Sequence, residues 1–577
     1  MVTVTIDGVQ VEVAKNTSIL EAAFKAGIKI PTLCFLKGVN ALGACRICLV
    51  EMIEGGNGLQ AACTLPAADG MVISTQSKAC RDARKINLEL ILSNHDRECL
   101  TCVRNKNCEL QTLADRLGVR DVPYEGAKTQ TIPDFSSPSI RRDPSKCILC
   151  RRCTAACNDI QEIGAIGMTE RGFNTIVEPV FSKSLADVLC INCGRCVQSC
   201  PVGALTVVSD TERVWEALND PKKHVVVQTA PAVRAALGEC FEMPIGTPVT
   251  GKMVTALKRL GFDEVFDTDF AADLTIMEEG TELISRLKEN RNIPMITSCS
   301  PGWVKFMEHF YHDFFYNMSS CKSPQQMMGA IVKTYYAEKN NIPREDIVSV
   351  SIMPCSAKKF ELQRPELGDD VDISITTIEL GEMIMQAGID FDALPDSGFD
   401  DVLGDASGAG VIFGATGGVM EAALRTVHKL VTGEELEDVN LTQVRGMEGV
   451  REATIKLGDM EVNVAVAHGT ANAHKVLRAV RAGEKDYHFI EIMACPGGCI
   501  NGGGQPPVTN EQLMAGGDHK ALRAKALYSE DSNNPVRRSH QNPSIQKLYE
   551  EFLGEPNGHK SHELLHTTYE KRPKYLY

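Results

Sequence analysis

Apolar residues occupy every second position from 2 to 6 and from 9 to 13, on either side of an Asp7-Gly8 step. This alternation is typical of two paired β-strands joined by a tight turn. Residues 18–26 then predict a short helix, which Thr17 or Ser18 can cap, and a loop containing cysteines follows it. We therefore expect a small α+β domain over residues 1–78.

The next part of the chain divides into segments of different pattern. Residues 79–120 carry apolar side chains at helical spacing, and residues 121–145 are rich in Pro, Ser and Asp, as in a linker. Over residues 146–208 one cysteine pattern occurs twice, which indicates two modules in tandem. Residues 518–577 have a polar, helical pattern, and we expect a docking segment without chemistry of its own.

A large α/β domain is expected over residues 209–517. Short apolar runs at 224–227, 347–353 and 464–467 predict buried strands, and amphipathic helical segments separate them. Most of the last cysteines follow predicted strands, which is where α/β sheets place their sites. Beyond this domain, three histidines are expected at the surface or as helix caps rather than as metal ligands: His559, His562 and His566.

The composition of the chain argues against some functional classes. A chain of 577 residues holds about four domains. Its 60 Lys and Arg against 75 Asp and Glu give a formal net charge of −15, which repels nucleic acid and anionic membrane surfaces. The sequence has no apolar run of about 18 residues and no leader-like start. We therefore expect a cytoplasmic protein that binds neither nucleic acid nor membrane.

The cysteines are concentrated near the N-terminus, with 16 of the 22 in the first 200 residues. In a reducing compartment such spacings indicate metal ligation rather than disulfides. Cys-x2-Cys-x2-Cys-x3-Cys starts at Cys147 and again at Cys190, and Pro201 follows the second copy. In this two-cluster pattern the fourth cysteine of each copy binds the other 4Fe-4S cluster, whereas zinc sites favour separated Cys-x2-Cys pairs. The predicted ligand sets are Cys147, Cys150, Cys153 and Cys200 for one cluster and Cys190, Cys193, Cys196 and Cys157 for the other.

Two further motifs precede the tandem repeat. Cys34-x10-Cys45-x2-Cys48-x14-Cys63 follows the short helix, as in a plant-type 2Fe-2S site, although zinc competes for this motif taken alone. His95-x3-Cys99-x2-Cys102-x5-Cys108 brings one imidazole and three thiolates together and predicts an accessory 4Fe-4S cluster. These sites together make four clusters, which form a path for electrons. The remaining cysteines are predicted structural thiols: Cys80, Cys240 and Cys321.

Three segments of the α/β domain combine cysteine with glycine or proline. They are Thr297-Ser-Cys-Ser-Pro-Gly-Trp303, Met353-Pro-Cys-Ser-Ala-Lys-Lys-Phe-Glu361 and Glu491-Ile-Met-Ala-Cys-Pro-Gly-Gly-Cys-Ile-Asn-Gly-Gly-Gly-Gln-Pro506. In this order, behind this series of cluster motifs, they resemble the motifs of the iron-only (FeFe) hydrogenases, and the resemblance covers essentially the whole chain. It implies an H-cluster, in which a cysteine joins a 4Fe-4S cube to a two-iron unit bearing CO, cyanide and a bridging azadithiolate.

The resemblance also implies roles for single residues. Cys355, Cys495 and Cys499 would hold the cube, with Cys499 as the bridge, and Lys358 would donate to a cyanide. Ala232 stands where many relatives have a serine donor, so one cyanide contact would be missing. Six residues stand at positions that line the two-iron pocket in relatives: Pro231, Ser323, Gln325, Met353, Phe413 and Met493.

One departure from the family pattern concerns the first motif. The family has two adjacent cysteines, of which the first relays protons and the second ligates the cube, whereas this chain has Cys299-Ser300. In one hypothesis the Ser300 oxygen or an open site replaces the thiolate, and Cys299 keeps the proton role. In the other, Cys299 ligates iron and Ser300 lies near the relay.

The family's proton relay matches four further residues, namely Glu279, Glu282, Ser319 and Arg286. The two glutamates and the arginine share one face of a predicted helix, at spacings of three and four residues. Without the resemblance, such a charged row would be taken for solvated surface. A relay member must exchange protons near neutral pH, so we expect at least one of these groups to have a shifted pKa.

The sequence as a whole predicts a multidomain protein. Small α+β 2Fe-2S ferredoxin-like and tandem 4Fe-4S ferredoxin-like domains precede a large α/β H-cluster domain with a helical, small-subunit-like C-terminal segment. The implied reaction converts protons and electrons reversibly into H2. Electrons would pass to ferredoxin or to sister subunits that bind flavin and NAD(P), because no Gly-x-Gly-x-x-Gly fingerprint follows a strand here. Maturation proteins would build the two-iron unit; the alternative is a non-catalytic H2 or redox sensor, or an electron-transfer protein, that retains the fold.

Overall fold

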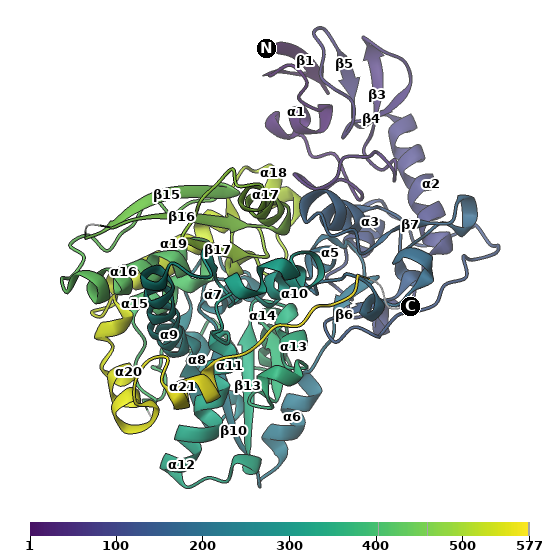
Figure 1. Cartoon of the computed structure of the whole chain (residues 1–577). Helices are drawn as coiled ribbons and strands as arrows, with labels where there is room; N and C mark the ends of the chain where they lie inside the picture. Colours follow the sequence, from purple (N-terminus) through teal and green to yellow (C-terminus); the bar gives the residue numbers. More distant parts are fainter. Residues whose placement is uncertain (402, 459, 575–577) are drawn as a thin grey trace. The chain divides into compact units, whose positions relative to one another are not determined.

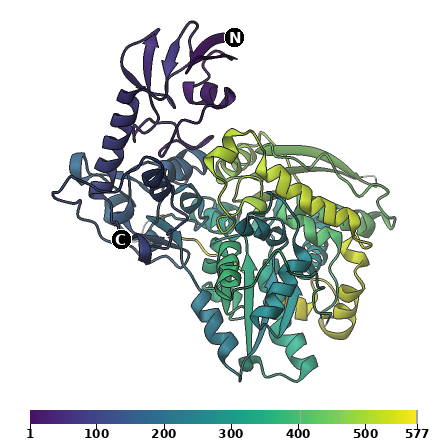
Figure 2. The same ribbon diagram turned by 180° about the vertical axis from the view of Figure 1, so that it is seen from behind.

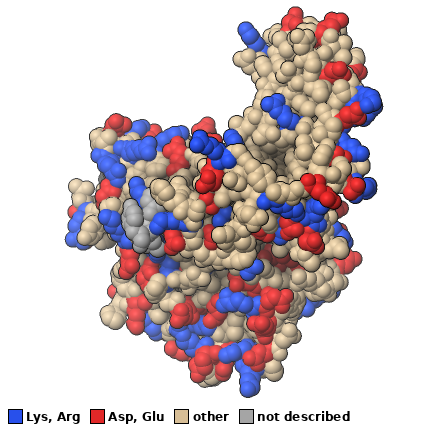
Figure 3. All heavy atoms as spheres, turned by 90° about the vertical axis from the view of Figure 1, so that its right-hand side faces the viewer, with Lys and Arg blue, Asp and Glu red and all other residues tan. Residues whose placement is uncertain are grey.

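The computed structural model describes residues 1–401, 403–458 and 460–574 (Figure 1). The chain forms two compact units: Met1–Val188 with Arg195–Thr206 and Pro507–Gly517, and Leu189–Gly194 with Val207–Pro506 and Asp518–Tyr577. Among the described residues, no helix combines the length and the apolar composition that a membrane span needs. Acidic and basic side chains are interspersed over the face drawn in Figure 3.

The first unit begins with the predicted hairpin. β1 (Val2–Ile6) pairs antiparallel with β2 (Val9–Val13), and Asp7 and Gly8 between them both have positive φ. The five-stranded sheet has the order β2-β1-β5-β3-β4, completed by β3 (Leu49–Glu54), β4 (Leu59–Ala61) and β5 (Val72–Ser74). α1 (Ile19–Lys25) begins after Ser18, whose side chain accepts a hydrogen bond from the Glu21 N–H in a capping box. The hairpin and the capped helix are thus confirmed.

Regular elements are short where the cluster motifs lie. α2 (Lys78–Asn94) and α3 (Glu109–Arg116) flank the loop that carries the second motif. In the tandem repeat, α4 (Arg152–Ala155) is a single turn, and Leu149 and Arg151 before it have φ of 53° and 64°. Non-glycine residues rarely adopt this conformation, which here turns the loop so that closely spaced cysteines can point to one centre. β6 (Ile140–Arg142) lies within the segment predicted as a linker.

Pro507–Gly517 belongs to the first unit, although the sequence predicts it within residues 209–517. Its helix α18 (Asn510–Met514) starts with a capping box at Thr509. Asn510 accepts a hydrogen bond of 3.0 Å from the Lys37 N–H, and Met514 packs against the core of the β1–β5 sheet. These contacts depend on residues almost 500 positions apart, so local pattern could not predict them.

The second unit contains two four-stranded sheets. In the first, β11 (Glu264–Asp267), β10 (His224–Thr229), β13 (Ile347–Met353) and β14 (Ile373–Thr376) are parallel in this order. The second has the order β12 (Met295–Ile296), β17 (Phe489–Met493), β16 (Met460–His468) and β15 (Val450–Leu457), and its last two strands form an antiparallel hairpin. Helices cover both sheets, which explains why β10 is a continuous apolar run.

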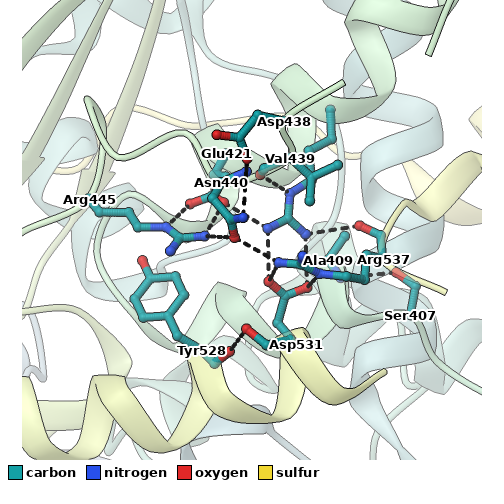
Figure 4. A network of polar contacts seen from close by, with 12 residues as sticks. Ser407, Ala409, Glu421, Asp438, Val439, Asn440, Arg445, Tyr528, Asp531 and Arg537 are labelled. Carbon is teal, nitrogen blue, oxygen red and sulfur yellow. Dashed lines mark hydrogen bonds and ion pairs between the residues drawn. The ribbon is translucent and has the colours of Figure 1, made fainter. Parts of the chain in front are cut away.

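The C-terminal segment packs on this unit as helices, as Figure 2 shows for the yellow part of the chain. α19 (His519–Asn533), α20 (Pro543–Leu548) and α21 (His559–Leu565) are its main elements. A buried polar network attaches α19 to α16 (Gly418–Thr432), where the Arg425 guanidinium lies 2.9 Å from Asp531 and 2.7 Å from Glu421 (Figure 4). Arg537 contacts the same Asp531 carboxylate at 2.6 Å.

Asp531→Asn should destabilise the second unit by about 3 to 5 kcal/mol, because it leaves the buried Arg425 without one of its two carboxylates. Urea unfolding followed by tryptophan fluorescence measures the loss, since Trp215 and Trp303 both lie in this unit. The control is Asp313→Asn, which removes an ion pair to Arg481 whose side chains are 48% and 47% exposed. We expect it to cost less than about 1 kcal/mol. Equal losses in both variants would contradict the prediction.

The three C-terminal histidines were expected at the surface or as helix caps, and His566 is the C-cap residue of α21. His559 and His562 are exposed, whereas the His566 side chain is only 5% exposed. It lies just after α21, where its ring contacts the buried Glu278 carboxylate of α9 (Thr268–Glu289). The pattern of a short polar helix does not reveal a polar partner that a distant helix supplies.

Candidate hydrogen-converting site

Five cysteines line one cavity in the second unit: Cys193 from the tandem repeat, and Cys299, Cys355, Cys495 and Cys499 from three loops of the α/β domain. Cys299 follows β12, Cys355 follows β13, and Cys495 and Cys499 follow β17. β13 belongs to the first sheet of this unit and β12 and β17 to the second, so the carboxyl ends of strands from both sheets face the cavity. The predicted convergence of Cys355, Cys495 and Cys499 is therefore present in the fold.

The glycines around Cys495 and Cys499 allow close backbone packing. Gly498 has φ of 95°, and a Cβ there would lie 2.7 Å from the Thr416 nitrogen. At Gly502 a Cβ would lie 2.1 Å from the Pro354 carbonyl oxygen, beside Cys355. Any side chain at these positions would separate the two cysteine loops.

The walls of the cavity are largely apolar. Five of the six predicted pocket residues line it: Pro231, Gln325, Met353, Phe413 and Met493. The sixth, Ser323, instead donates a hydrogen bond of 3.0 Å to Glu361 and lines a neighbouring cavity. The side chain of Ala232 offers no hydrogen bond, and its backbone carbonyl accepts one of 2.7 Å from Gln505.

Glu361 organises the polar corner of the cavity, and the sequence analysis missed it. Its Oε2 accepts hydrogen bonds from Lys358 at 2.9 Å, Ser323 at 3.0 Å and Gln325 at 2.8 Å. The Lys358 amino group also donates to the Cys299 carbonyl at 3.3 Å. The only signal in the sequence is that Lys358 and Glu361 are three residues apart on α13 (Ala357–Glu361).

Cys299 and Ser300 line the cavity side by side, directly before α10 (Pro301–Phe310). The Ser300 hydroxyl oxygen accepts a hydrogen bond of 3.3 Å from the Ala494 N–H, next to Cys495. Burial raises the pKa of the Cys299 thiol well above its usual value, and the charges of Glu279 and Cys499 raise it further. The charges of Glu279 and Cys499 therefore both act on the Cys299 thiol.

The predicted relay residues are adjacent and mostly buried. Burial, and then the charge of Glu282, raises the pKa of Glu279 to about 8. The Ser319 hydroxyl donates to Glu282 at 2.9 Å, and the Arg286 guanidinium contacts the other Glu282 oxygen at 2.6 Å. Both glutamates and Arg286 lie on one face of α9, with Arg286 nearest its C-terminal end. These three charged residues of α9 therefore do not form a solvent-exposed surface.

Cys147, Cys150, Cys153 and Cys200 line a cavity of about 460 Å³ in the first unit. Three of them come from the first copy of the tandem repeat and Cys200 from the second, as the two-cluster pattern predicts. Burial raises the pKa of Cys147 to about 11. Cys157 and Cys196 lie in the first unit, and Cys190 and Cys193 in the second, so this second ligand set stays a prediction.

The two remaining cluster motifs also lie in the first unit. The Cys34 N–H donates to the Cys45 sulfur at 3.4 Å, and a hydrogen bond from the Cys45 thiol lowers the pKa of Cys34 to about 6. Cys48 and Cys63 share a second thiol–thiol hydrogen bond. His95 ends α2, and its buried Nδ1 has no hydrogen-bond partner among the described residues. Cys99, Cys102 and Cys108 follow within the same loop.

These donor sets fit iron-sulfur groups. Thiols gathered in pairs and fours, with a buried imidazole nitrogen lacking a partner, are the ligands that such clusters take. The apolar cavity of the second unit, with one ammonium group at its edge, fits a larger anionic group.

Most of the chain matches known protein families. Residues 223–503 match the iron only hydrogenase large subunit, C-terminal domain, and residues 517–572 match the iron hydrogenase small subunit. Residues 1–78 match a 2Fe-2S iron-sulfur cluster binding domain. Residues 84–123 match the NADH-ubiquinone oxidoreductase-G iron-sulfur binding region, and residues 137–206 the ferredoxin-like domain of NADH-quinone oxidoreductase subunit 3.

Individual relatives extend over the whole chain. The NADP-reducing hydrogenase subunit HndD of Solidesulfovibrio fructosivorans is 51% identical over 594 residues, with 100% of both chains covered. Iron hydrogenase 1 of Clostridium pasteurianum is 43% identical over 99% of this chain and 100% of its own. A solved [FeFe]-hydrogenase structure concerned with oxygen inactivation of the H cluster is 43% identical, with a TM-score of 0.56, over 63% of this chain and 100% of its own.

Proposed function

Because the chain belongs to the family of iron-only (FeFe) hydrogenases, we propose that it interconverts protons and electrons with H2 at the cavity of the second unit. The observation that carries this proposal is the convergence of Cys355, Cys495 and Cys499 on one apolar cavity with Lys358 at its edge. The accessory site of the first unit also has thiols around a cavity, but the cavity here carries the Lys358 ammonium donor and the Cys299 thiol beyond the three proposed ligands. This combination favours catalysis over electron transfer alone.

Cys355, Cys495 and Cys499 would hold the cube of an H-cluster, with Cys499 as the bridge and Ser300 at the fourth ligand position. When bound, this group supplies the redox chemistry that combines protons with electrons. Met353, Phe413, Met493 and their neighbours exclude water from the site. Lys358, which Glu361 orients, offers an ammonium donor to an anionic iron ligand.

Protons would move between the cavity and the exterior along the chain's own side chains. Cys299 faces Glu279, which can hold a proton at neutral pH because burial raises its pKa to about 8. Ser319 connects this carboxyl group to Glu282, to which its hydroxyl donates at 2.9 Å. Each of these groups can accept a proton from one neighbour and donate one to the next.

Electrons would enter or leave through four accessory clusters in the ligand sets predicted from the sequence. The matches at 84–123 and 137–206 are to parts of NADH-oxidising complexes, which supports electron exchange with partner subunits. The HndD relative, an NADP-reducing hydrogenase subunit, favours partners that bind flavin and NAD(P) over free ferredoxin. Maturation proteins would assemble the two-iron unit, and the charge of −15 is unfavourable for nucleic-acid partners.

Infrared spectroscopy of the matured protein under H2 and under CO tests the proposal. We expect bands of iron-bound CO and cyanide that change with the gas, together with H2 evolution from reduced viologen. Bands without turnover would favour the alternative, an H2 or redox sensor that keeps the fold. Absence of the bands in a chain with full accessory-cluster iron would contradict an assembled H-cluster.

A further inference from the structure

Arg286 cannot carry a proton away from Glu282. Its guanidinium donates to the Glu282 carboxylate and also to backbone carbonyl oxygens, at 3.1 Å for Asn292 and 2.7 Å for Met318. Arginine stays protonated at any pH at which a protein functions, so it has no site to accept a further proton. Arg286 therefore positions Glu282, and proton exchange with solvent needs another group.

A second set of hydrogen bonds leads from Glu282 into the C-terminal segment. The Ser320 hydroxyl lies 3.3 Å from Glu282 Oε1 and 2.8 Å from His566 Nδ1. On the other side of the ring, His566 Nε2 lies 3.1 Å from Glu278 Oε2. The ring centroid of His566 is 4.1 Å from that of His562, which is exposed. Hydrogen bonds thus run from Glu282 through Ser320 to His566, and a ring contact leads on from His566 to the exposed His562.

Both ring nitrogens of His566 have polar partners, the Ser320 hydroxyl and the Glu278 carboxylate. Glu278 is fully buried and also accepts hydrogen bonds from the Tyr549 hydroxyl and the Asn557 N–H. A carboxylate so held stabilises an imidazolium beside it. The titratable groups facing His566 from the elements packed around it are Glu278, Glu282, Cys321, Tyr549 and His562.

We propose that His566 is a proton-transfer residue that connects Glu282 with solvent beside His562, an inference that rests on the proposed hydrogenase function. Outward, the Glu282 O–H bond breaks and its proton passes to the Ser320 oxygen. Ser320 at the same time gives its hydroxyl proton to His566 Nδ1, where a new N–H bond forms. The protonated ring then turns away from Ser320 and Glu278 toward the exposed His562, where one of its N–H bonds breaks and the proton passes to water. Inward transfer uses the same atoms in reverse.

The test uses the matured full-length chain with His566→Gln. Glutamine keeps a polar side chain between Ser320 and Glu278 but carries no exchangeable charge. We expect H2 turnover to fall about 10-fold or more, with a larger solvent isotope effect in D2O and an altered pH profile. Added imidazole should restore part of the rate. The control is His559→Gln, because His559 lies on α21 but is exposed, and this variant should match the wild type.

Ser320→Ala separates proton transfer from structural support, because it breaks the hydrogen bonds from Glu282 to His566 but leaves the His566–Glu278 contact in place. The infrared CO and cyanide bands should stay unchanged in both variants. The proposal would be overturned if His566→Gln and Ser320→Ala both kept the turnover, the pH profile and the isotope effect of the wild type. If His566→Gln loses the bands, Ser320→Ala alone decides. A wild-type chain without bands or turnover would overturn the proposed function, and this inference with it.

Discussion

Glu279→Gln should lower hydrogen turnover by about 100-fold or more while iron content and the infrared bands stay at wild-type levels. Glu279 is 2% exposed on α9, shares a hydrogen bond with Ser319, and its charge acts on the Cys299 thiol. The amide keeps the size of the side chain but cannot transfer a proton. Glu289→Gln is the control, since Glu289 lies on the same helix with a 56% exposed side chain.

The pH profile gives this prediction a second measurement. Below pH of about 8 the Glu279 carboxyl group holds its proton and can pass it toward Cys299, whereas above that pH it is charged and has none to give. H2 evolution by the wild type should therefore fall as pH rises through the pKa of about 8. This fall of the H2-evolution rate with rising pH should be absent in Glu279→Gln. A variant with wild-type rate and profile would show that protons bypass this residue.

Cys299→Ala should keep the iron of the cube and lose turnover. Cys299 lies beside Glu279, and the Ser300 oxygen lies beside Ala494, next to Cys495. This arrangement favours the hypothesis in which Ser300 occupies the ligand position and Cys299 moves protons. Iron per chain and the CO and cyanide bands measure the result, with turnover expected to fall at least about 100-fold.

Two further variants give reference values for the iron content of Cys299→Ala. Cys355→Ala removes a thiol that lines the cavity and should lose the cube together with the two-iron unit. Ser300→Cys supplies a thiolate at the position that the family fills with cysteine, and it should retain cube iron under chelator longer than the wild type. Loss of the cube in Cys299→Ala, equal to the loss in Cys355→Ala, would support iron ligation by Cys299 instead.

Local chemistry predicted the parts of the fold that depend on near neighbours. The β1–β2 hairpin follows from alternation around Asp7-Gly8, and the start of α1 follows from the Ser18 cap. The position of Cys355 after β13 follows from the apolar run at 347–353, which ends just before it. The order of strands in each sheet does not follow, because pairing joins segments far apart in the chain.

The parts of the site that were missed involve polar partners brought together by the fold. Glu361 is an ordinary charged residue in the sequence, and its role depends on Ser323 and Gln325, which stand at the start of a distant helix. The sequence allowed a capping position for His566 but not its contact with Glu278, because that carboxylate lies on a helix almost 290 positions away. The two residues of such a buried pair are far apart in the chain, so no local sequence pattern predicts their contact.

The return of Pro507–Gly517 to the first unit limits how this protein can be shortened. A fragment that starts at residue 207 would still contain α18 but would lack the sheet on which Met514 packs and the Lys37 backbone that Asn510 binds. Its apolar side would face water only a few residues after the glycine-rich loop that follows Cys499. A minimal catalytic version would therefore need a redesigned connection between residues 506 and 518, and not only a new N-terminus.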